Sequence, residues 1–350
     1  MASRRVLKVL TWLLFMIVLV ESSSQLLYRF RYGVWRFKGD PVNYMTFFEW
    51  HPWLVGSPQP GVSFSAGDVT ISHNSLGFRG PEFNLHKNPA KKRVVVYGGS
   101  STYGVNVSDS DTWSSYLQQE LGPSYEVVNA GVPGYSTAEA VIQTALQQMD
   151  LDADIAVYYQ GWNDIRNSHV EGLKSDYSSF HGPSQIGSLG LNRIKWAYRS
   201  AFAAIMGRFM ERVTAKKSFL KQRGKTQPGV DSRALSIYKY NLQTLAGLAA
   251  LRGTQAVMIP QVLNYAVLTS DKPYGAWIPY IADKDIKEVM GAYNKAMSEV
   301  CSEENLTCVS SVLAEDWRAG DFVDEGHFSI EGTKKFARLV ADAVKESQSA

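Results

Sequence analysis

The chain has 350 residues, of which 45% are hydrophobic, and a formal net charge of +3. This length and composition can bury a full hydrophobic core, so we expect one large domain with extensions. The charge is small, and Lys and Arg are spread along the chain, which argues against nucleic acid as a partner. The sequence has no His-Glu-x-x-His motif and no Cys/His spacing typical of zinc, and it predicts no metal and no cofactor.

The first 24 residues have the pattern of a signal peptide or a signal anchor. Arg4, Arg5 and Lys8 precede an unbroken apolar run over residues 9–20. The run is short for a free-standing membrane span, although the two apolar residues before Lys8 extend it. No Ala-x-Ala cleavage site follows, so we favour an uncleaved membrane anchor over a cleaved, secreted form or a buried helix. We therefore predict that the rest of the chain lies outside the cytoplasm.

Residues 25–90 form a predicted N-terminal extension. They are rich in aromatic residues, Pro and Gly, and they end in "ISHNSLGFRGPEF". This composition favours short strands and turns over helices.

Residues 91–350 alternate between predicted strands and helices. Strands are predicted at Arg93–Tyr97, Glu126–Asn129, Ile155–Tyr159, Ala256–Pro260 and Thr307–Ser310. Helices are predicted at Thr112–Leu121, Ser136–Met149, Leu235–Leu251, Lys284–Val300 and Ile330–Val344. Repeated strand–helix units predict an α/β fold, with a parallel sheet of about five strands and helices on both faces.

A segment at about 172–231 interrupts this alternation. Within it, apolar residues recur at helical spacing between Ile194 and Val213, and many Lys and Arg residues accompany them. We favour a helical cap packed on its own domain. The alternative is a basic amphipathic helix on an anionic membrane surface.

Unusual loops follow the predicted strands. "GGSSTYG" follows the first strand, "NAGVPGYS" the second and "QGWNDI" the third, while "DEGHFS" follows the fifth after a longer connection. The carboxyl ends of parallel strands meet at one edge of a sheet, and ligands bind there. Four distant loops are therefore expected to converge on one site.

The loop after the first strand does not match three familiar glycine motifs. Gly99 and Gly104 have the spacing of a phosphate-binding loop, but Val105 and Asn106 replace its lysine and hydroxyl. The dinucleotide pattern Gly-x-Gly-x-x-Gly is absent. The Gly-x-Ser-x-Gly elbow fails because Thr102 stands at the second glycine. A serine just beyond a strand, among small residues, remains as the notable feature.

A serine nucleophile needs an adjacent base, an orienting carboxylate and donors for an oxyanion. His327 is the best candidate base for Ser100, and Asp324, three residues earlier, is the candidate carboxylate. The backbone N–H of Gly134, the amide of Asn163 and the N–H of Ser100 itself are the candidate donors. These groups contain every part that acyl transfer requires.

The four blocks together resemble the SGNH (GDSL-like) hydrolase superfamily. The resemblance implies Ser100 as nucleophile, Gly134 and Asn163 as oxyanion-hole donors with Ser100, and Asp324 with His327 as the rest of a catalytic triad. It also implies a flavodoxin-like α/β/α sandwich. "NSLGFRG" and the N-terminal apolar run resemble the membrane-anchored members of a bacterial subgroup.

The resemblance covers about residues 93–350, with the insertion described above. It departs from the family pattern at Gly99, where many members have aspartate; we expect no effect on the triad. Ser101 is the rival nucleophile and Gly131 the rival oxyanion donor, and the block register favours Ser100 and Gly134. We expect Asp164 to form a local Asx-turn.

We predict a serine esterase that acts on an acyl ester, with an acetyl ester of an envelope or exported polysaccharide as the first hypothesis. The alternatives are an O-acyltransferase of envelope polysaccharide and a non-catalytic glycan-binding or assembly protein. Aromatic residues after the fourth strand could stack on sugars or bind an acyl chain, or they could pack in the core. They are Tyr265, Tyr274, Trp277 and Tyr280.

Cys301 and Cys308 are the only two cysteines. A disulfide between them would suit an oxidising compartment, and two unpaired thiols are the alternative.

Overall fold

A computed structural model gives the structure of the chain. The described residues are 2–33, 35–38, 47–49, 51, 54, 56–147, 149–169, 173–175, 199–207, 209–210, 229–271 and 281–348. The chain divides into two compact units. One consists of Met1–Gln59 with Gly182–Lys221, and the other, which we call the sheet unit, of Pro60–His181 with Gln222–Ala350. The predicted boundaries at residues 24, 90 and 231 stay predictions.

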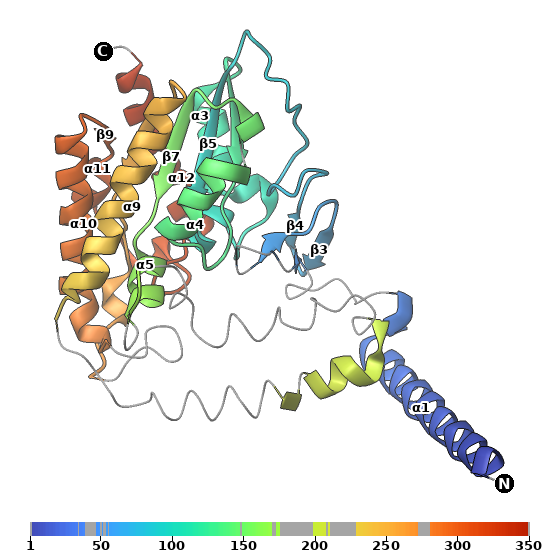
Figure 1. Ribbon diagram of the computed structural model, residues 1–350. Coiled ribbons are helices and arrows are strands. Elements are labelled where there is room, and N and C mark those ends of the chain that lie inside the picture. The colour runs from blue at the N-terminus through green and yellow to red at the C-terminus, as the bar shows by residue number, and fades with distance from the viewer. Residues whose placement is uncertain are drawn as a thin grey trace. The chain divides into compact units, whose positions relative to one another are not determined.

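The sheet unit is built on a five-stranded parallel sheet in the order β6-β5-β7-β8-β9 (Figure 1). The strands are β5 (Lys92–Gly98), β6 (Tyr125–Asn129), β7 (Ile155–Tyr159), β8 (Gln255–Ile259) and β9 (Thr307–Cys308). Numbered along the chain, this order is 2-1-3-4-5, the flavodoxin-like arrangement. The predicted α/β fold is confirmed.

Helices cover both faces of the sheet, and β5 shows why. Val94 and Val96 point toward a core lined by α3 and α12, while Val95 and Tyr97 point toward a core lined by α4, α9 and α10. Successive side chains of a strand alternate between faces, so a strand covered on both sides must be apolar throughout. The helices are α3 (Trp113–Leu121), α4 (Thr137–Ile142), α5 (Trp162–Ser168), α9 (Ser232–Leu251), α10 (Ile286–Glu303) and α12 (Ile330–Ser347).

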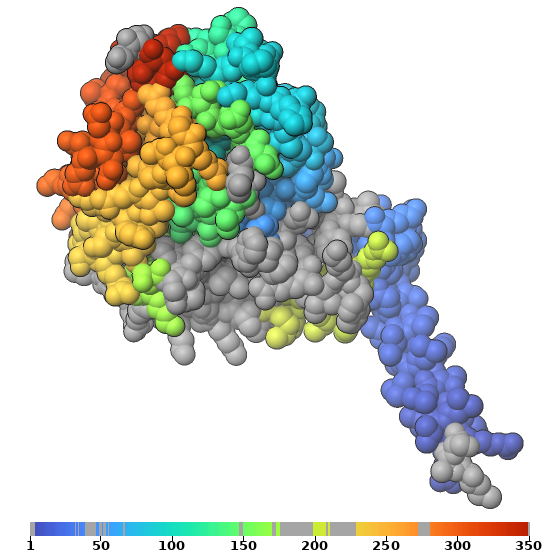
Figure 2. All heavy atoms as spheres, turned by 45° about the horizontal axis from the view of Figure 1, so that its top comes forward, coloured from blue at the N-terminus to red at the C-terminus, as the bar shows by residue number. Residues whose placement is uncertain are grey.

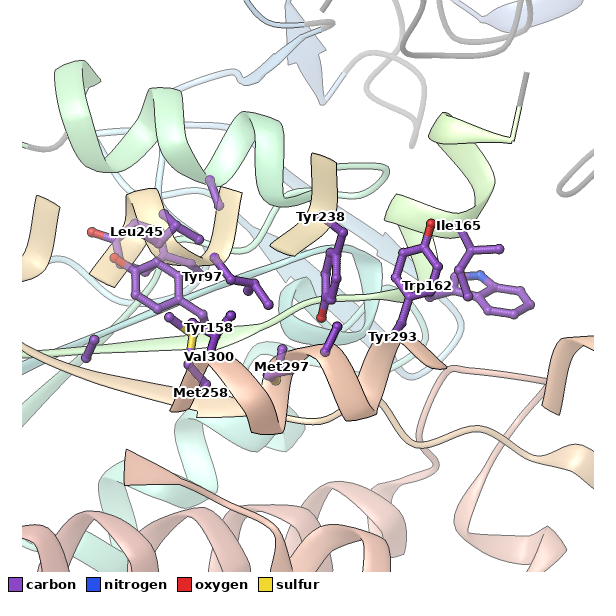
Figure 3. Packing of buried hydrophobic residues seen from close by; sticks show 14 of the residues in the cluster. Tyr97, Tyr158, Trp162, Ile165, Tyr238, Leu245, Met258, Tyr293, Met297 and Val300 are labelled. Carbon is purple, nitrogen blue, oxygen red and sulfur yellow. The ribbon is translucent and has the colours of Figure 1, made fainter. Parts of the chain in front are cut away.

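The core between the sheet and helices α9 and α10 is rich in tyrosine (Figure 3). The rings of Tyr97 and Tyr158 stack with centroids 5.0 Å apart, and those of Tyr238 and Tyr293 lie 4.8 Å apart. All four side chains are buried. Aromatic pairs at this spacing add to the stabilisation from apolar burial. The surfaces of α9 and α10 lie side by side in Figure 2.

Polar residues fix where the helices begin. Thr112 accepts a hydrogen bond from the Ser115 N–H at the start of α3, and Asp231 accepts from two N–H groups at the start of α9. Ser329 does the same for α12. These side chains satisfy N–H groups that a helix start leaves without partners.

The predicted helix Ser136–Met149 is shorter in the structure. α4 ends at Ile142, and a π-helical turn follows over Gln143–Gln147. The Gln143 amide donates to the Ala130 carbonyl at 3.2 Å, and Thr144 bonds to the Tyr158 hydroxyl at 3.2 Å. Contacts with the sheet therefore favour a wider turn than local helix propensity would give.

In the other unit, α1 (Ala2–Tyr32) contacts a helical segment at 199–207. Its stretch Arg4–Arg31 is long and apolar enough to cross a membrane: its most apolar window of 18 residues has a mean hydropathy of 1.9 and is not buried. A membrane anchor and a signal sequence both meet this criterion.

Cys301 and Cys308 are two free thiols in the structure. The neighbouring Cys308 thiol, together with burial, raises the pKa of the Cys301 thiol.

Candidate active site

The loop after β5 places Ser100 at the carboxyl edge of the sheet. β5 ends at Gly98, and a short helix, α2 (Ser100–Tyr103), begins immediately after Gly99. A side chain at Gly98 would collide with Thr102 and with the Tyr159 carbonyl, and one at Gly99 would collide with the Asn163 amide. The glycines therefore permit the tight approach of α2 and α5 to the strand end.

Ser100, His327 and Asp324 lie in contact, although His327 lies 227 positions after Ser100 in the chain. The Ser100 Oγ is 2.7 Å from the His327 Nε2, and the His327 Nδ1 is 2.6 Å from the Asp324 Oδ2. The other Asp324 oxygen accepts the N–H groups of Gly326 at 3.0 Å and His327 at 2.8 Å. The carboxylate thus orients the ring and the ring contacts the hydroxyl, as nucleophilic catalysis by serine requires.

The Asp324 carboxyl group is adapted to stay ionised. Burial would raise its pKa, but the hydrogen bond and charge of His327 and the two N–H donors hold the pKa below the ordinary aspartate value. An ionised Asp324 can stabilise an imidazolium when the ring takes a proton.

The Asn163 amide, one of the candidate oxyanion donors, lies against the loop that carries Ser100. The Asn163 amide donates one hydrogen to the Tyr135 carbonyl at 2.8 Å, which leaves its second hydrogen available, and the same nitrogen lies against Gly99. The Gly131 N–H is already used, since it donates to the Asn129 Oδ1 at 2.9 Å. Within the described part of the chain, the N–H groups of Gly134 and Ser100 have no acceptor.

Ser101, the rival nucleophile, has a different partner. Its hydroxyl donates to the Gly326 carbonyl at 2.7 Å, on the loop that carries His327. The same loop is held by Asn264, whose N–H donates to the Glu325 carbonyl at 2.8 Å. Ser101 therefore connects the two loops of the site and does not contact the imidazole.

The prediction for Asp164 was wrong. Its carboxylate does not serve a local turn; it accepts from the Thr137 N–H at 3.1 Å and from the Thr137 hydroxyl at 2.5 Å. Burial raises the pKa of Asp164 to about 7, although the Thr137 bonds oppose the rise. The residue ties α5, which carries Asn163, to the start of α4.

Arg79 is a positioning residue that the sequence did not single out. It is buried, and its guanidinium donates to the carbonyls of Tyr103 at 3.1 Å and Val107 at 2.8 Å and pairs with Asp109 at 2.5 Å. These bonds hold the turn that follows α2. Arg79 lies within "NSLGFRG", so the block that resembled a subgroup signature supports the loop of Ser100.

Two predictions about the surroundings of the site stay open. Tyr274, Trp277 and Tyr280 lie outside the described residues, whereas Tyr265 is half-buried beneath the ammonium group of Lys287, 5.8 Å from the ring centroid. In the described ranges, no group of three or more His, Cys, Asp or Glu side chains could hold a metal ion.

A flavodoxin-like sheet with these contacts at its carboxyl edge is the arrangement of an acyl-transferring hydrolase. The model of the GDSL-like lipase/acylhydrolase family matches residues 96–335, and the chain belongs to this family. It is a carboxylic ester hydrolase.

Solved structures resemble the chain at low identity. A lipase/acylhydrolase from Enterococcus faecalis is 13% identical, covers 73% of this chain and 96% of its own, and has a TM-score of 0.46. The aryl esterase of M. smegmatis is 14% identical over 73% and 99% of the two chains, with a TM-score of 0.41. A mutant acetyl-xylooligosaccharide esterase from Geobacillus stearmophilus is 13% identical over 74% and 96%, with a TM-score of 0.45. Likenesses of this degree do not specify a substrate.

A short segment resembles one curated protein of another kind. The endoribonuclease YbeY of Treponema denticola is 38% identical over 65 residues, which are 18% of this chain and 42% of that protein. The match thus spans less than half of that relative.

Proposed function

We propose that the protein is a serine esterase that forms an acyl-enzyme on Ser100. The observation that supports this most is the continuous contact from the Ser100 hydroxyl through His327 to Asp324. In the proposed reaction, the Ser100 Oγ attacks the ester carbonyl carbon while the His327 Nε2 takes the hydroxyl proton. Asp324 stabilises the resulting imidazolium.

The tetrahedral intermediate then needs donors for its negative oxygen. We assign this role to the N–H groups of Ser100 and Gly134 and to the free amide hydrogen of Asn163. As the intermediate collapses, the imidazolium gives its proton to the departing alcohol. Water, activated by the same ring, then attacks the acyl-enzyme and releases the acid.

The substrate is proposed to be an acylated glycan of the cell envelope, met outside the cytoplasm by a membrane-anchored enzyme. The support is the apolar α1 and the resemblance of "NSLGFRG" to anchored members of the family. An O-acyltransferase would use the same residues, with a sugar hydroxyl in place of water as acceptor.

Ester hydrolysis by the purified full chain tests the proposal. p-Nitrophenyl esters of short and long acyl chains and acetylated glycans are compared, each with Ser100→Ala and Ser101→Ala. We expect Ser100→Ala to abolish turnover, roughly a 10⁴-fold loss or more. Ser101→Ala should keep most of the activity, because it loses only the bond to Gly326. If Ser101→Ala is the inactive variant, the assignment of the nucleophile is wrong.

A further inference from the structure

We infer that the helical segment at 199–207, with Phe209 and Met210, is a second membrane-binding element that lies in the plane of the lipid–water boundary beside α1. The inference rests on the proposed anchoring of α1 in the membrane. Its partner is the phospholipid bilayer that α1 enters. The contacts that support it all lie within one compact unit of the chain.

Glu21 fixes the start of this helix. It is the first residue after the apolar run that ends at Val20. Its carboxylate accepts from the Ser200 hydroxyl at 2.7 Å, the Ala201 N–H at 2.8 Å and the Phe202 N–H at 3.3 Å. A side chain of α1 therefore caps the N-terminus of the second helix. This role normally belongs to the residue that directly precedes a helix in the chain.

A second hydrogen bond between the two helices lies one turn later along α1. The Gln25 amide donates to the Arg199 carbonyl at 3.1 Å. The small side chains of Ala201 and Ala204 then pack against Tyr28, and all three are buried. These contacts hold the helix against residues 21–28, immediately after the apolar run, where a membrane anchor leaves the hydrocarbon. Figure 1 shows the 199–207 segment at this end of α1.

One face of the helix is exposed and apolar. Its exposed large side chains are Phe202, Met206, Phe209 and Met210, with exposed fractions of 45%, 39%, 57% and 52%. Their spacing of four, three and one residues places them on one side of a helix. The residues of α1 at the same level are exposed and apolar as well, namely Leu26, Leu27 and Phe30.

Neighbouring residues have the character of a membrane interface. Trp35 stacks on Phe37 with ring centroids 5.8 Å apart, and the Arg29 guanidinium lies 5.0 Å from the Trp35 centroid. Aromatic rings and arginines gather at the level of lipid headgroups. This apolar face has such neighbours and is joined to a membrane-spanning helix. Contact with a bilayer surface would therefore stabilise it more than contact with water.

Photo-crosslinking in native membranes tests this inference with the full-length chain. p-Benzoylphenylalanine replaces Phe202 or Phe209, which preserves an aromatic ring, and the cells carry an alkyne-tagged phosphatidylcholine. Leu14 in the apolar run is the positive control. Leu251, which is 83% exposed and lies at the end of α9 in the sheet unit, is the negative control. We expect lipid adducts at Phe202, Phe209 and Leu14 and few at Leu251.

The outcomes separate the inference from the proposal on which it rests. Lipid adducts at Leu14 but none at Phe202 or Phe209 would overturn the in-plane helix and leave the anchor intact. A crosslink from Phe209 to the sheet unit would overturn the in-plane helix in favour of a helical cap on the enzyme. Absence of adducts at Leu14 would overturn the anchor itself, and the inference with it.

Glu21→Ala provides a second check, because it removes the cap and leaves the apolar face unchanged. We expect roughly a fivefold loss of lipid adducts at Phe209, the value of one helix cap, with Leu14 unaffected. Equal labelling of Phe209 in Glu21→Ala and in the unmodified chain would show that Glu21 does not position the helix.

Discussion

Ser100 and His327 are positioned by residues that take no part in the proposed chemistry. Ser101 bonds to the loop of His327, while Arg79 bonds to the turn that follows Ser100. The loop of Ser100 and the loop of His327 are therefore each held at two points. One point is the contact between the Ser100 and His327 side chains, and the other is a hydrogen bond to a backbone carbonyl. Such support preserves the 2.7 Å contact between hydroxyl and imidazole.

At the scale of single residues, His327 and Asp324 should differ in their effect on serine reactivity. We expect His327→Ala to lower kcat/KM about as much as Ser100→Ala, since members of a triad act as a unit. Asp324→Asn should lower kcat/KM by about 10⁴-fold or less, because it disturbs the orientation of the His327 ring but keeps that ring as the base. The rate of fluorophosphonate labelling at Ser100 measures both effects.

Asp316→Asn is the matched control, because Asp316 is exposed and pairs only loosely with Arg318, at 3.6 Å. In this variant, the fluorophosphonate should label Ser100 as fast as it does in the unmodified protein. Full-speed labelling of His327→Ala at neutral pH would show that another residue activates Ser100.

At the scale of elements, the approach of α5 to the end of β5 depends on Gly99. Gly99→Ala would place a Cβ against the Asn163 amide nitrogen and displace it. We expect kcat to fall by roughly 10²–10³, the value of one oxyanion donor, with little change in KM. Steady-state kinetics checks this.

Gly247→Ala is the control for the glycine, since a Cβ there in α9 meets nothing within 4 Å. That variant should keep full activity. An active Gly99→Ala would show that Asn163 does not act as a donor, or that the loop moves aside at no cost.

The contact between α4 and α5 predicts a dependence of stability on pH. Burial raises the pKa of Asp164 to about 7 from 3.8, so between these values the folded chain holds a proton that the unfolded chain has lost. The contribution of Asp164 to native stability therefore falls as the pH rises through this window. Asp164→Asn stays neutral and should gain stability over the unmodified protein as the pH rises, by an amount on the order of 3 kcal/mol.

Urea unfolding at pH 4.5 and pH 8 measures this difference. Any loss from replacing the Thr137 contacts is the same at both pH values, so only the change with pH matters. A difference between variant and unmodified protein that does not change with pH would show that Asp164 ionises normally in the fold.

At the scale of the whole molecule, the N-terminal segment should direct the enzyme outside the cytoplasm. Arg4, Arg5 and Lys8 precede the apolar run, and basic residues favour the cytoplasmic side. We expect alkaline phosphatase fused after Ala350 to be active, because it needs an oxidising compartment, and the chain to fractionate with membranes. The same fusion without residues 1–24 should be inactive. Recovery of the full-length chain as a soluble cytoplasmic protein would refute both expectations.

The sequence alone determined the sheet, its strands and the family. The stretch Val94–Tyr97 of β5, for example, is apolar throughout because both faces of the strand are covered, and that pattern is local enough to recognise. The loop blocks predicted which residues meet, because parallel strands bring their carboxyl ends to one edge whatever the details of packing.

Only the tertiary structure decided what those residues contact. No local pattern shows that Arg79 supports the loop of Ser100, that Asp164 bonds to Thr137, or that Glu21 caps a helix 180 residues away. The π-helical turn after α4 likewise depends on contacts with the sheet. Hydrogen bonds between distant segments form only where packing brings donor and acceptor together, and burial there changes pKa values that composition leaves at their ordinary level.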